Sequence, residues 1–254
     1  MTDPPRTEGC DAKHPLRDMA WSRAGAIAVV LAGAPSTRVV RFSVRVGLLV
    51  AGSVTIAVAV AVTLWNGLGA GPLDVFIGAV RTRSGLPLGP TVWLVVGSMI
   101  VVSVVLGRRP GPGTVISPLI IGAVMQAAAA MLESVAAPDA LVVRIVIHLL
   151  AVGAIGLGAG ALIVSRLGAG SGELLASAAS DRSGRPEPRV RMAIEFSWLV
   201  VGVALGGPVG LGTILLASTI GPSVAVGHRI VDGAVAQTSE RSLAYVAAAA
   251  SPAG

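Results

Sequence analysis

The sequence predicts an all-α membrane protein with about six transmembrane helices, arranged as two three-helix repeats of inverted topology with additional short amphipathic or re-entrant helices. Three observations support this prediction. Apolar residues make up 54% of the 254 residues and charged residues only 13%, against about 25% charged residues in soluble domains. Stretches such as residues 46–65 are as long as a helix that crosses the bilayer needs to be. The sequence also matches itself at an offset of 99 residues.

Six segments are apolar enough to be spanning helices, and three of them are short. They are residues 43–65, 91–107, 113–132, 141–165, 190–206 and 211–228. Arginine is concentrated before the first segment, between the second and third, and after the fourth. Because basic residues stay on the cytoplasmic side, we expect both termini to lie in the cytoplasm of a bacterial cell. The net charge of +6 then reflects topology and not affinity for nucleic acid.

The chain divides into four parts on this prediction. Residues 1–37 form a polar N-terminal tail that we expect to be disordered, and residues 229–254 form a cytoplasmic C-terminal tail. Residues 38–132 are the first membrane repeat and residues 133–228 the second. The sole cysteine, Cys10, lies in the N-terminal tail, so it has no partner for an intramolecular disulfide. Met1 and Met19 both stay open as the translation start.

The internal repeat aligns residues 45–122 with residues 144–221 without a gap, and 22 of the 78 pairs are identical. The identical residues include three short motifs that interrupt the apolar segments. These are LGAG at 68–71 and 167–170, RSG at 83–85 and 182–184, and GxGT at 111–114 and 210–213. Three spans in each repeat make the second copy enter the bilayer from the opposite side, as in many secondary transporters. A duplication that serves structure alone is the alternative.

The LGAG motifs open short helices, each of which carries an acidic residue in its first turn. Pro72 suits a first helical turn and Asp74 complements the helix dipole there, whereas Ser171 replaces the proline in the second copy as a capping residue. Free amides at such helix starts can hold an anion, although capping and turning also explain these residues. The candidate binding residues of the two copies, together with the GxGT threonines, are Gly69, Gly71, Asp74, Thr114, Gly168, Gly170, Glu173 and Thr213.

Glu195 is the acidic residue that lies deepest in a predicted span. A carboxylate inside the membrane is costly and therefore a functional candidate. Arg191 precedes it by four residues on the same helical face, so a salt bridge to Arg191 or Arg189 at the helix end is the competing interpretation. His148 is expected to be a packing residue.

No group of residues has the spacing of a metal site, a nucleotide-binding loop or a catalytic centre, so we expect no metal, no cofactor and no enzymatic activity. The expected partners are the lipid bilayer and a small solute. Gly156 and Gly160 form a GxxxG motif, which predicts close helix contact, either within the chain or in a homo-oligomer.

The motifs together resemble those of the YczE/YyaS/YitT-like family of bacterial integral membrane proteins. The resemblance covers residues 38–228 and includes LGAGPLD at 68–74, RMAIE at 191–195, LGGPVGLGT at 205–213 and IGP at 220–222. It implies a multi-pass protein of the cytoplasmic membrane and no defined activity. The sequence departs from the family where Ser171-Gly-Glu173 replaces the more usual Pro and Asp. This departure weighs against a binding role for Glu173, which stays among the candidates because of its position.

Two functions follow as hypotheses. The inverted repeat and the Gly-rich helix starts favour a small-solute permease or facilitator with its path at the interface between the repeats. The alternative is a scaffold or regulatory protein that does not transport and that binds a partner through the Arg-rich loop at residues 166–191.

Overall fold

The computed structural model describes residues 35–249, and side chains from Phe42 to Thr238. The expected N-terminal tail therefore lies almost entirely outside the described residues. The chain divides into two units, residues 1–44 and 45–254, and the packing described below belongs to the second unit. Every described element is a helix, which confirms the all-α prediction.

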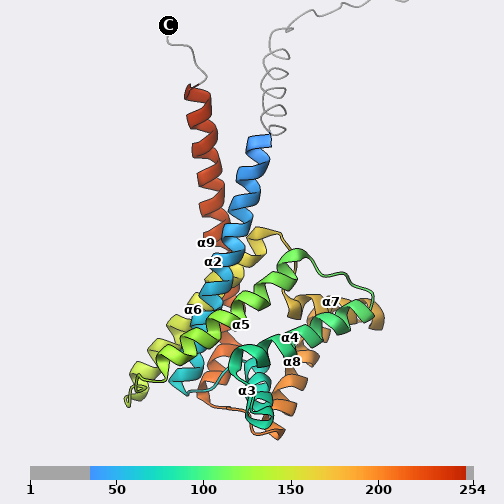
Figure 1. Cartoon of the computed structure of the whole chain (residues 1–254), viewed down its shortest axis with the longest axis vertical. Coiled ribbons are helices and arrows are strands. Elements are labelled where there is room, and N and C mark those ends of the chain that lie inside the picture. Colours follow the sequence, from blue (N-terminus) through green and yellow to red (C-terminus); the bar gives the residue numbers. More distant parts are fainter. Residues whose placement is uncertain (1–34, 250–254) are drawn as a thin grey trace, which may run out of the picture. The chain divides into compact units, whose positions relative to one another are not determined.

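Eight helices follow one another along the described chain (Figure 1). They are α2 (Pro35–Asn66), α3 (Pro72–Ser84), α4 (Leu88–Val105), α5 (Pro112–Leu132), α6 (Leu141–Ser165), α7 (Ser171–Ser183), α8 (Glu187–Ala204) and α9 (Leu211–Ala249). The bounds of α3 and α7 differ by 99 residues at both ends, and so do those of α4 and α8. The short helices after each LGAG motif were thus predicted from the repeat.

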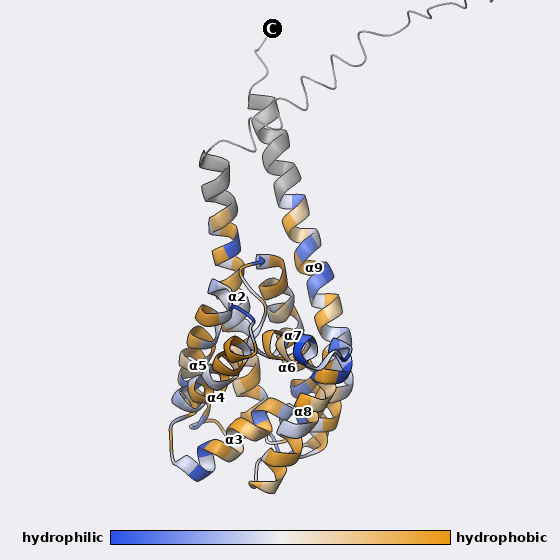
Figure 2. Ribbon diagram, turned by 90° about the vertical axis from the view of Figure 1, so that its right-hand side faces the viewer, coloured by the Kyte–Doolittle hydropathy of each residue, from blue (hydrophilic) through white to orange (hydrophobic). Residues whose placement is uncertain are grey.

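Five helices contain stretches long and apolar enough to cross a membrane. These stretches are Phe42–Asn66, Leu88–Val105, Pro112–Leu132, Leu141–Ser165 and Leu211–Thr238. Hydrophobic residues predominate along α4 and α5 in Figure 2. The expected span at residues 190–206 corresponds to α8, which fails this criterion because its first half carries Glu187, Arg189, Arg191 and Glu195. The expected C-terminal tail begins inside α9, which continues as a helix to Ala249.

The long helices pack through small residues. Gly52 of α2 lies against Ala161 of α6 and Ile56 lies against Gly158, so these two helices run antiparallel. Gly156 and Gly160 of α6 lie against the backbone of Ser223 and Gly227 in α9, and those two helices run parallel. The GxxxG motif is therefore used within the chain, where glycine lets two helix backbones approach closely.

Each short helix packs against a helix of the other half. α3 contacts α8, and α7 contacts α4. Val75, Ile77 and Ala79 of α3 are buried, and an added Cβ on Gly202 of α8 would lie 2.8 Å from the Phe76 nitrogen. Leu174, Ala176 and Ala178 are the buried residues of α7. The short helices therefore join the two halves and are packed among other helices.

Candidate functional site

The LGAG motif of each half lies against the GxGT motif of the other half, and we call these two contacts the crossed entrances. The amide of Gly113 donates to the Leu167 carbonyl at 2.9 Å, and the amide of Gly212 donates to the Leu68 carbonyl at 2.7 Å. These two bonds occupy equivalent positions, since both donor and acceptor shift by 99 residues. The structure thus brings the candidate residues together across the halves and not within one repeat.

The two threonines of the GxGT motifs are buried in these contacts. The Thr114 hydroxyl donates to the Ala169 carbonyl at 2.6 Å, and the Thr213 hydroxyl accepts a bond from the Gly210 amide at 3.3 Å. Gly69 and Gly168 face these hydroxyls and adopt φ values of 116° and 152°. Glycine is required there because another residue would be strained by its backbone and would meet the threonine. Thr213 therefore contributes to the start of α9, while Thr114 joins the two halves.

The acidic residues at the starts of the short helices fold back over the preceding glycine. Gly71 is the N-cap of α3 and Gly170 is the N-cap of α7. The carboxylates of Asp74 and Glu173, three residues further on, lie beside these glycines, as in a capping box. The prediction that Ser171 caps α7 is wrong, because Ser171 is already the first helical residue.

The two acids differ in what surrounds them. Glu173 forms an ion pair with Arg191, with 3.0 Å between Oε1 of Glu173 and Nη1 of Arg191. Arg191 also pairs with Glu195, with 3.0 Å between Nε and Oε1. All three side chains are about half exposed. This is the helix-end salt bridge that competed with a functional role for Glu195, and it links α7 to α8. The position equivalent to Arg191 in the first half is Val92, so Asp74 has no corresponding cation.

Asp74 lines a cavity of about 720 Å³ between the two halves. Its other lining residues come from α2, α3, α4, α5 and the loop before α9, and they include Leu64, Arg81, Met125 and Pro208. Burial raises the pKa of the Asp74 carboxyl to about 6, and a bond from the Gly71 amide opposes the rise. Arg81 was not among the predicted site residues, although its place seven residues after Asp74 puts both residues on one face of α3.

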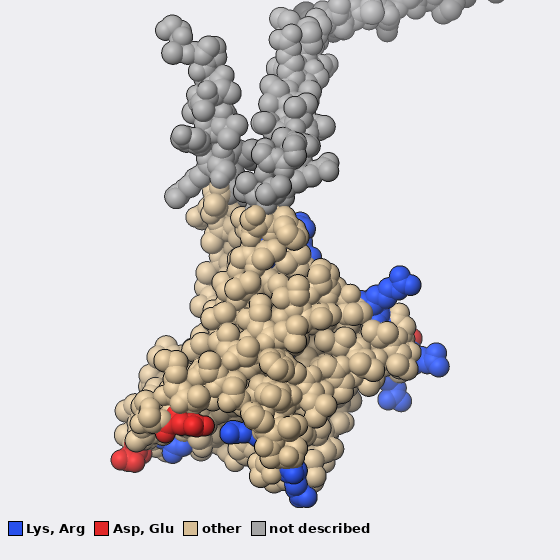
Figure 3. Space-filling view, in the orientation of Figure 1, with Lys and Arg blue, Asp and Glu red and all other residues tan. Residues whose placement is uncertain are grey.

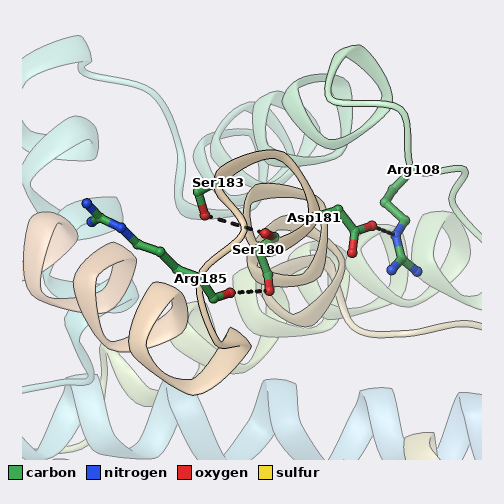
Figure 4. Close-up of polar contacts among 5 residues, drawn as sticks. All are labelled: Arg108, Ser180, Asp181, Ser183 and Arg185. Carbon is green, nitrogen blue, oxygen red and sulfur yellow. Dashed lines mark hydrogen bonds and ion pairs between the residues drawn. The ribbon is translucent and has the colours of Figure 1, made fainter.

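A second cavity of about 700 Å³ lies between α7 and α8 and is lined by Arg185 and Arg189. Outside this cavity, Arg108 from the α4–α5 connection forms an ion pair with Asp181 of α7 at 2.6 Å (Figure 4). This contact holds the pKa of Asp181 below its usual range. The equivalent positions in the other half are Gly207 and Thr82, so the contact has no counterpart there. Figure 3 shows charged side chains near the margins of one face.

A buried polar cluster near the crossed entrance at Gly212 was not predicted. The Arg144 guanidinium donates from Nε and Nη2 to the Asn66 carbonyl, at 3.0 and 2.6 Å. The Asn66 amide returns a bond to the Arg144 carbonyl at 2.7 Å. His148 is fully buried and its Nε2 bonds to the Gly212 carbonyl at 3.0 Å. The signal in the sequence was the single charge, Arg144, in an otherwise apolar span.

Comparisons with known proteins match the chain to a family whose function is not defined. A family model described as a family of unknown function (DUF6198) matches residues 37–229. A protein of Haemophilus influenzae described as uncharacterized is 28% identical over 159 residues, which cover 63% of this chain and 72% of that protein. No solved structure matches. Among the residues that the structure describes, no group of three or more His, Cys, Asp or Glu side chains is placed to hold a metal ion.

Proposed function

Since this chain belongs to DUF6198, a family of unknown function, its activity has to be inferred from its own residues, and we propose that it is a small-solute permease or facilitator of the bacterial cell membrane. Its path lies at the interface between the two halves. Our proposal includes a relationship of this chain to the YczE/YyaS/YitT-like membrane proteins. Both termini lie in the cytoplasm.

The packing directions support an inverted repeat. α2 and α6 occupy equivalent positions in the two halves and run antiparallel, as an in-plane two-fold axis requires. The end of α2 meets the start of α9 through Leu68 and Gly212, and the end of α6 meets the start of α5 through Leu167 and Gly113. These contacts place the two crossed entrances at opposite ends of the α2–α6 pair.

The sixth span on this proposal is α8, in spite of its charges. Arg191, Glu173 and Glu195 neutralise one another in part, which lowers the cost of bringing α8 into the membrane. After Glu195 and up to the end of the helix at Ala204, the residues are apolar except for Ser197. The charged end of α8 then lies on the cytoplasmic side with the Arg-rich connection, in agreement with the distribution of basic residues.

The observation that carries the proposal is the cavity of about 720 Å³ beside one crossed entrance. Residues of both halves line it, and Asp74 and Arg81 contribute charged groups to its wall. Transporters with inverted repeats bind their solutes where broken or short helices of the two repeats meet. The entrance on the opposite side is held by ion pairs from Arg108 to Asp181 and from Arg191 to Glu173. When a transport path opens on one side of the membrane at a time, one entrance is open while the other is closed. The difference between the two entrances fits such a path.

The test is solute flux into liposomes that contain the purified chain. The panel contains inorganic ions and small neutral, anionic, cationic and zwitterionic metabolites. Gly78 lies in the cavity wall, and an added Cβ would approach Pro208 of the other half at 2.9 Å. Gly78→Leu should therefore abolish flux. Gly97→Leu is the matched control, because an added Cβ at Gly97 meets nothing within 4 Å.

Flux of at least one solute by the wild type and by Gly97→Leu, and its loss in a folded Gly78→Leu variant, supports the permease. A wild type that moves no solute of the panel faster than empty liposomes contradicts it. The scaffold hypothesis then gains weight. That hypothesis predicts a partner protein that binds the wild type and is lost when Arg185 and Arg189, which are both exposed, are replaced by Gln.

A further inference from the structure

The cavity between the halves holds two opposite charges on one helix. Asp74 lies in the first turn of α3 and Arg81 in its last turn, and both line the cavity. Seven residues are nearly two helical turns, so the two side chains share a face and their Cα atoms are about 10 Å apart along the axis. This spacing leaves room between the carboxylate and the guanidinium.

Neither charge has an ion-pair partner in the part of the chain that the structure describes. The ion pairs there join Arg108 to Asp181 and Arg191 to Glu173 and Glu195. Asp74 is half-buried, and a half-buried carboxylate without a cation is costly. The equivalent acid in the second half, Glu173, has its cation in Arg191. Asp74 therefore lacks the cationic partner that Glu173 has at the equivalent position of the second half.

Most of the other residues that line the cavity have apolar side chains, among them Leu64, Ile77, Met125 and Pro208. A volume of about 720 Å³ is within the usual range of about 300–1,000 Å³ for sites of small ligands. An apolar wall between two separated charges fits a short aliphatic chain with one charge at each end. A simple cation leaves Arg81 without a partner, and a simple anion leaves Asp74 without one.

We propose that this cavity binds a small zwitterion, with its ammonium group at the carboxylate of Asp74 and its anionic group at the guanidinium of Arg81. The claim that the zwitterion is transported rests on the proposed function, whereas the claim that it binds does not. A ligand that satisfies both groups carries no net charge. Its passage through a permease would move no net charge across the membrane.

The test is a binding measurement on the purified full-length chain in detergent by isothermal titration calorimetry. The probes are the ω-amino acids glycine, β-alanine, 4-aminobutyrate and 5-aminovalerate, in which the distance between the two charges increases. Propylamine and butyrate are the analogues with a single charge. We expect at least one ω-amino acid to bind tenfold more tightly than either analogue. Equal binding of an analogue with a single charge overturns the proposal.

Substitutions should change selectivity and not only affinity. Asp74→Asn removes the partner of the ammonium group, so butyrate should then bind as well as the best ω-amino acid. Arg81→Gln removes the partner of the anionic group, so propylamine should then bind as tightly as the best ω-amino acid. Arg83→Gln, in the same turn of α3 as Arg81 but outside the cavity wall, is the control and should keep wild-type binding. A zwitterion that binds equally to all three variants overturns the proposal.

The selectivity change keeps the proposal testable if a variant is less stable, since each single variant is expected to retain one half of the site. The result is also separable from the permease proposal. Binding that depends on Asp74 and Arg81 without flux overturns the permease and leaves the site. Flux of other solutes without zwitterion binding overturns the site and leaves the permease.

Discussion

Gly113 at the start of α5 donates its amide hydrogen to the carbonyl of Leu167, which follows the end of α6, at 2.9 Å. The bond from Gly212 to Leu68 repeats it in the opposite direction between the halves. Each half thus supplies one donor and one acceptor to the other. Because these polar groups are buried, their loss in a separated half would leave them without partners, so we expect neither half to fold alone.

The glycines of the crossed entrances should be intolerant of any side chain. Gly69→Ala places a Cβ 2.6 Å from the Thr213 hydroxyl and forces alanine to adopt a φ of 116°. The backbone strain alone costs on the order of 1–3 kcal/mol, so the variant should unfold at a clearly lower temperature in detergent. Gly168→Ala should behave similarly, because its φ is 152° and its Cβ would meet the Thr114 hydroxyl at 2.6 Å.

Gly97→Ala is the control for both variants. It lies in the middle of α4, where an added Cβ meets nothing within 4 Å. Alanine has a higher helix propensity than glycine by about 1 kcal/mol, so this variant should be as stable as the wild type or slightly more stable. Equal melting temperatures for Gly69→Ala, Gly168→Ala and Gly97→Ala would contradict the close contacts at the crossed entrances.

Ligand binding in the cavity should weaken as the pH falls through about 6. Burial raises the pKa of the Asp74 carboxyl to about 6, so Asp74 is mainly neutral at pH 5 and mainly ionised at pH 7. The ionised form is the one that attracts an ammonium group, and affinity should therefore drop by about tenfold from pH 7 to pH 5. Titration of the best ω-amino acid at both values measures the change. The same experiment on Asp74→Asn should show no comparable drop.

Asp74 should also make stability depend on pH, in the opposite direction from most acids. Its pKa in the folded chain is about 6, higher than its ordinary value of 3.8, so the folded state binds more protons than the unfolded state between these two pH values. Its contribution to stability is therefore largest at low pH and is lost as the pH rises from about 4 to above 6. Thermal unfolding of the wild type and of Asp74→Asn at pH 5 and pH 7 measures the difference. A wild type that gains stability relative to Asp74→Asn over this interval would show that Asp74 is paired.

Glu195 should be dispensable for binding and flux. Its carboxylate contacts Arg191 at 3.0 Å and is 42% exposed, and such pairs contribute about 0–1 kcal/mol to stability. Glu195→Gln should therefore lower the melting temperature by a few degrees at most and leave transport as it is. Arg191→Gln should have the larger effect, since it also leaves Glu173 without its cation. Loss of flux in a Glu195→Gln variant of normal stability would restore the functional interpretation of this residue.

Much of the helix order was predictable, because apolar length and the repeat both report on local structure. The starts of α3 and α7 followed from Gly, Pro and acidic residues a few positions apart. The crossed entrances were not predictable, since nothing local says that residues 68–71 meet residues 210–213. The placement of Asp74 and Arg81 in one cavity wall was missed for a related reason. Two residues on one helix become a site only when distant residues such as Met125 and Pro208 close the cavity.

The membrane topology can be tested with single cysteines and a membrane-impermeant thiol reagent on intact cells. Cys10→Ser removes the native thiol without touching the described residues. One exposed position after each proposed span then receives a cysteine. Leu86, Arg109, Ala137 and Val209 lie in loops, whereas Arg182 lies in the last turn of α7 and Arg229 lies within α9. We expect labelling in intact cells at Leu86, Ala137 and Val209, and labelling at the other three only after the membrane is permeabilised.

The cysteines at Arg182, Val209 and Arg229 decide whether α8 spans the membrane. If α8 crosses, Val209 lies on the outside, and Arg182 and Arg229 on the inside. If its charged first half keeps it on the cytoplasmic surface, Val209 is protected like Arg182, and α9 then carries Arg229 to the outside. Because the inverted arrangement needs an equal number of spans in both halves, labelling at Arg229 in intact cells would overturn it. The cavity would then have to be assigned to a different membrane face.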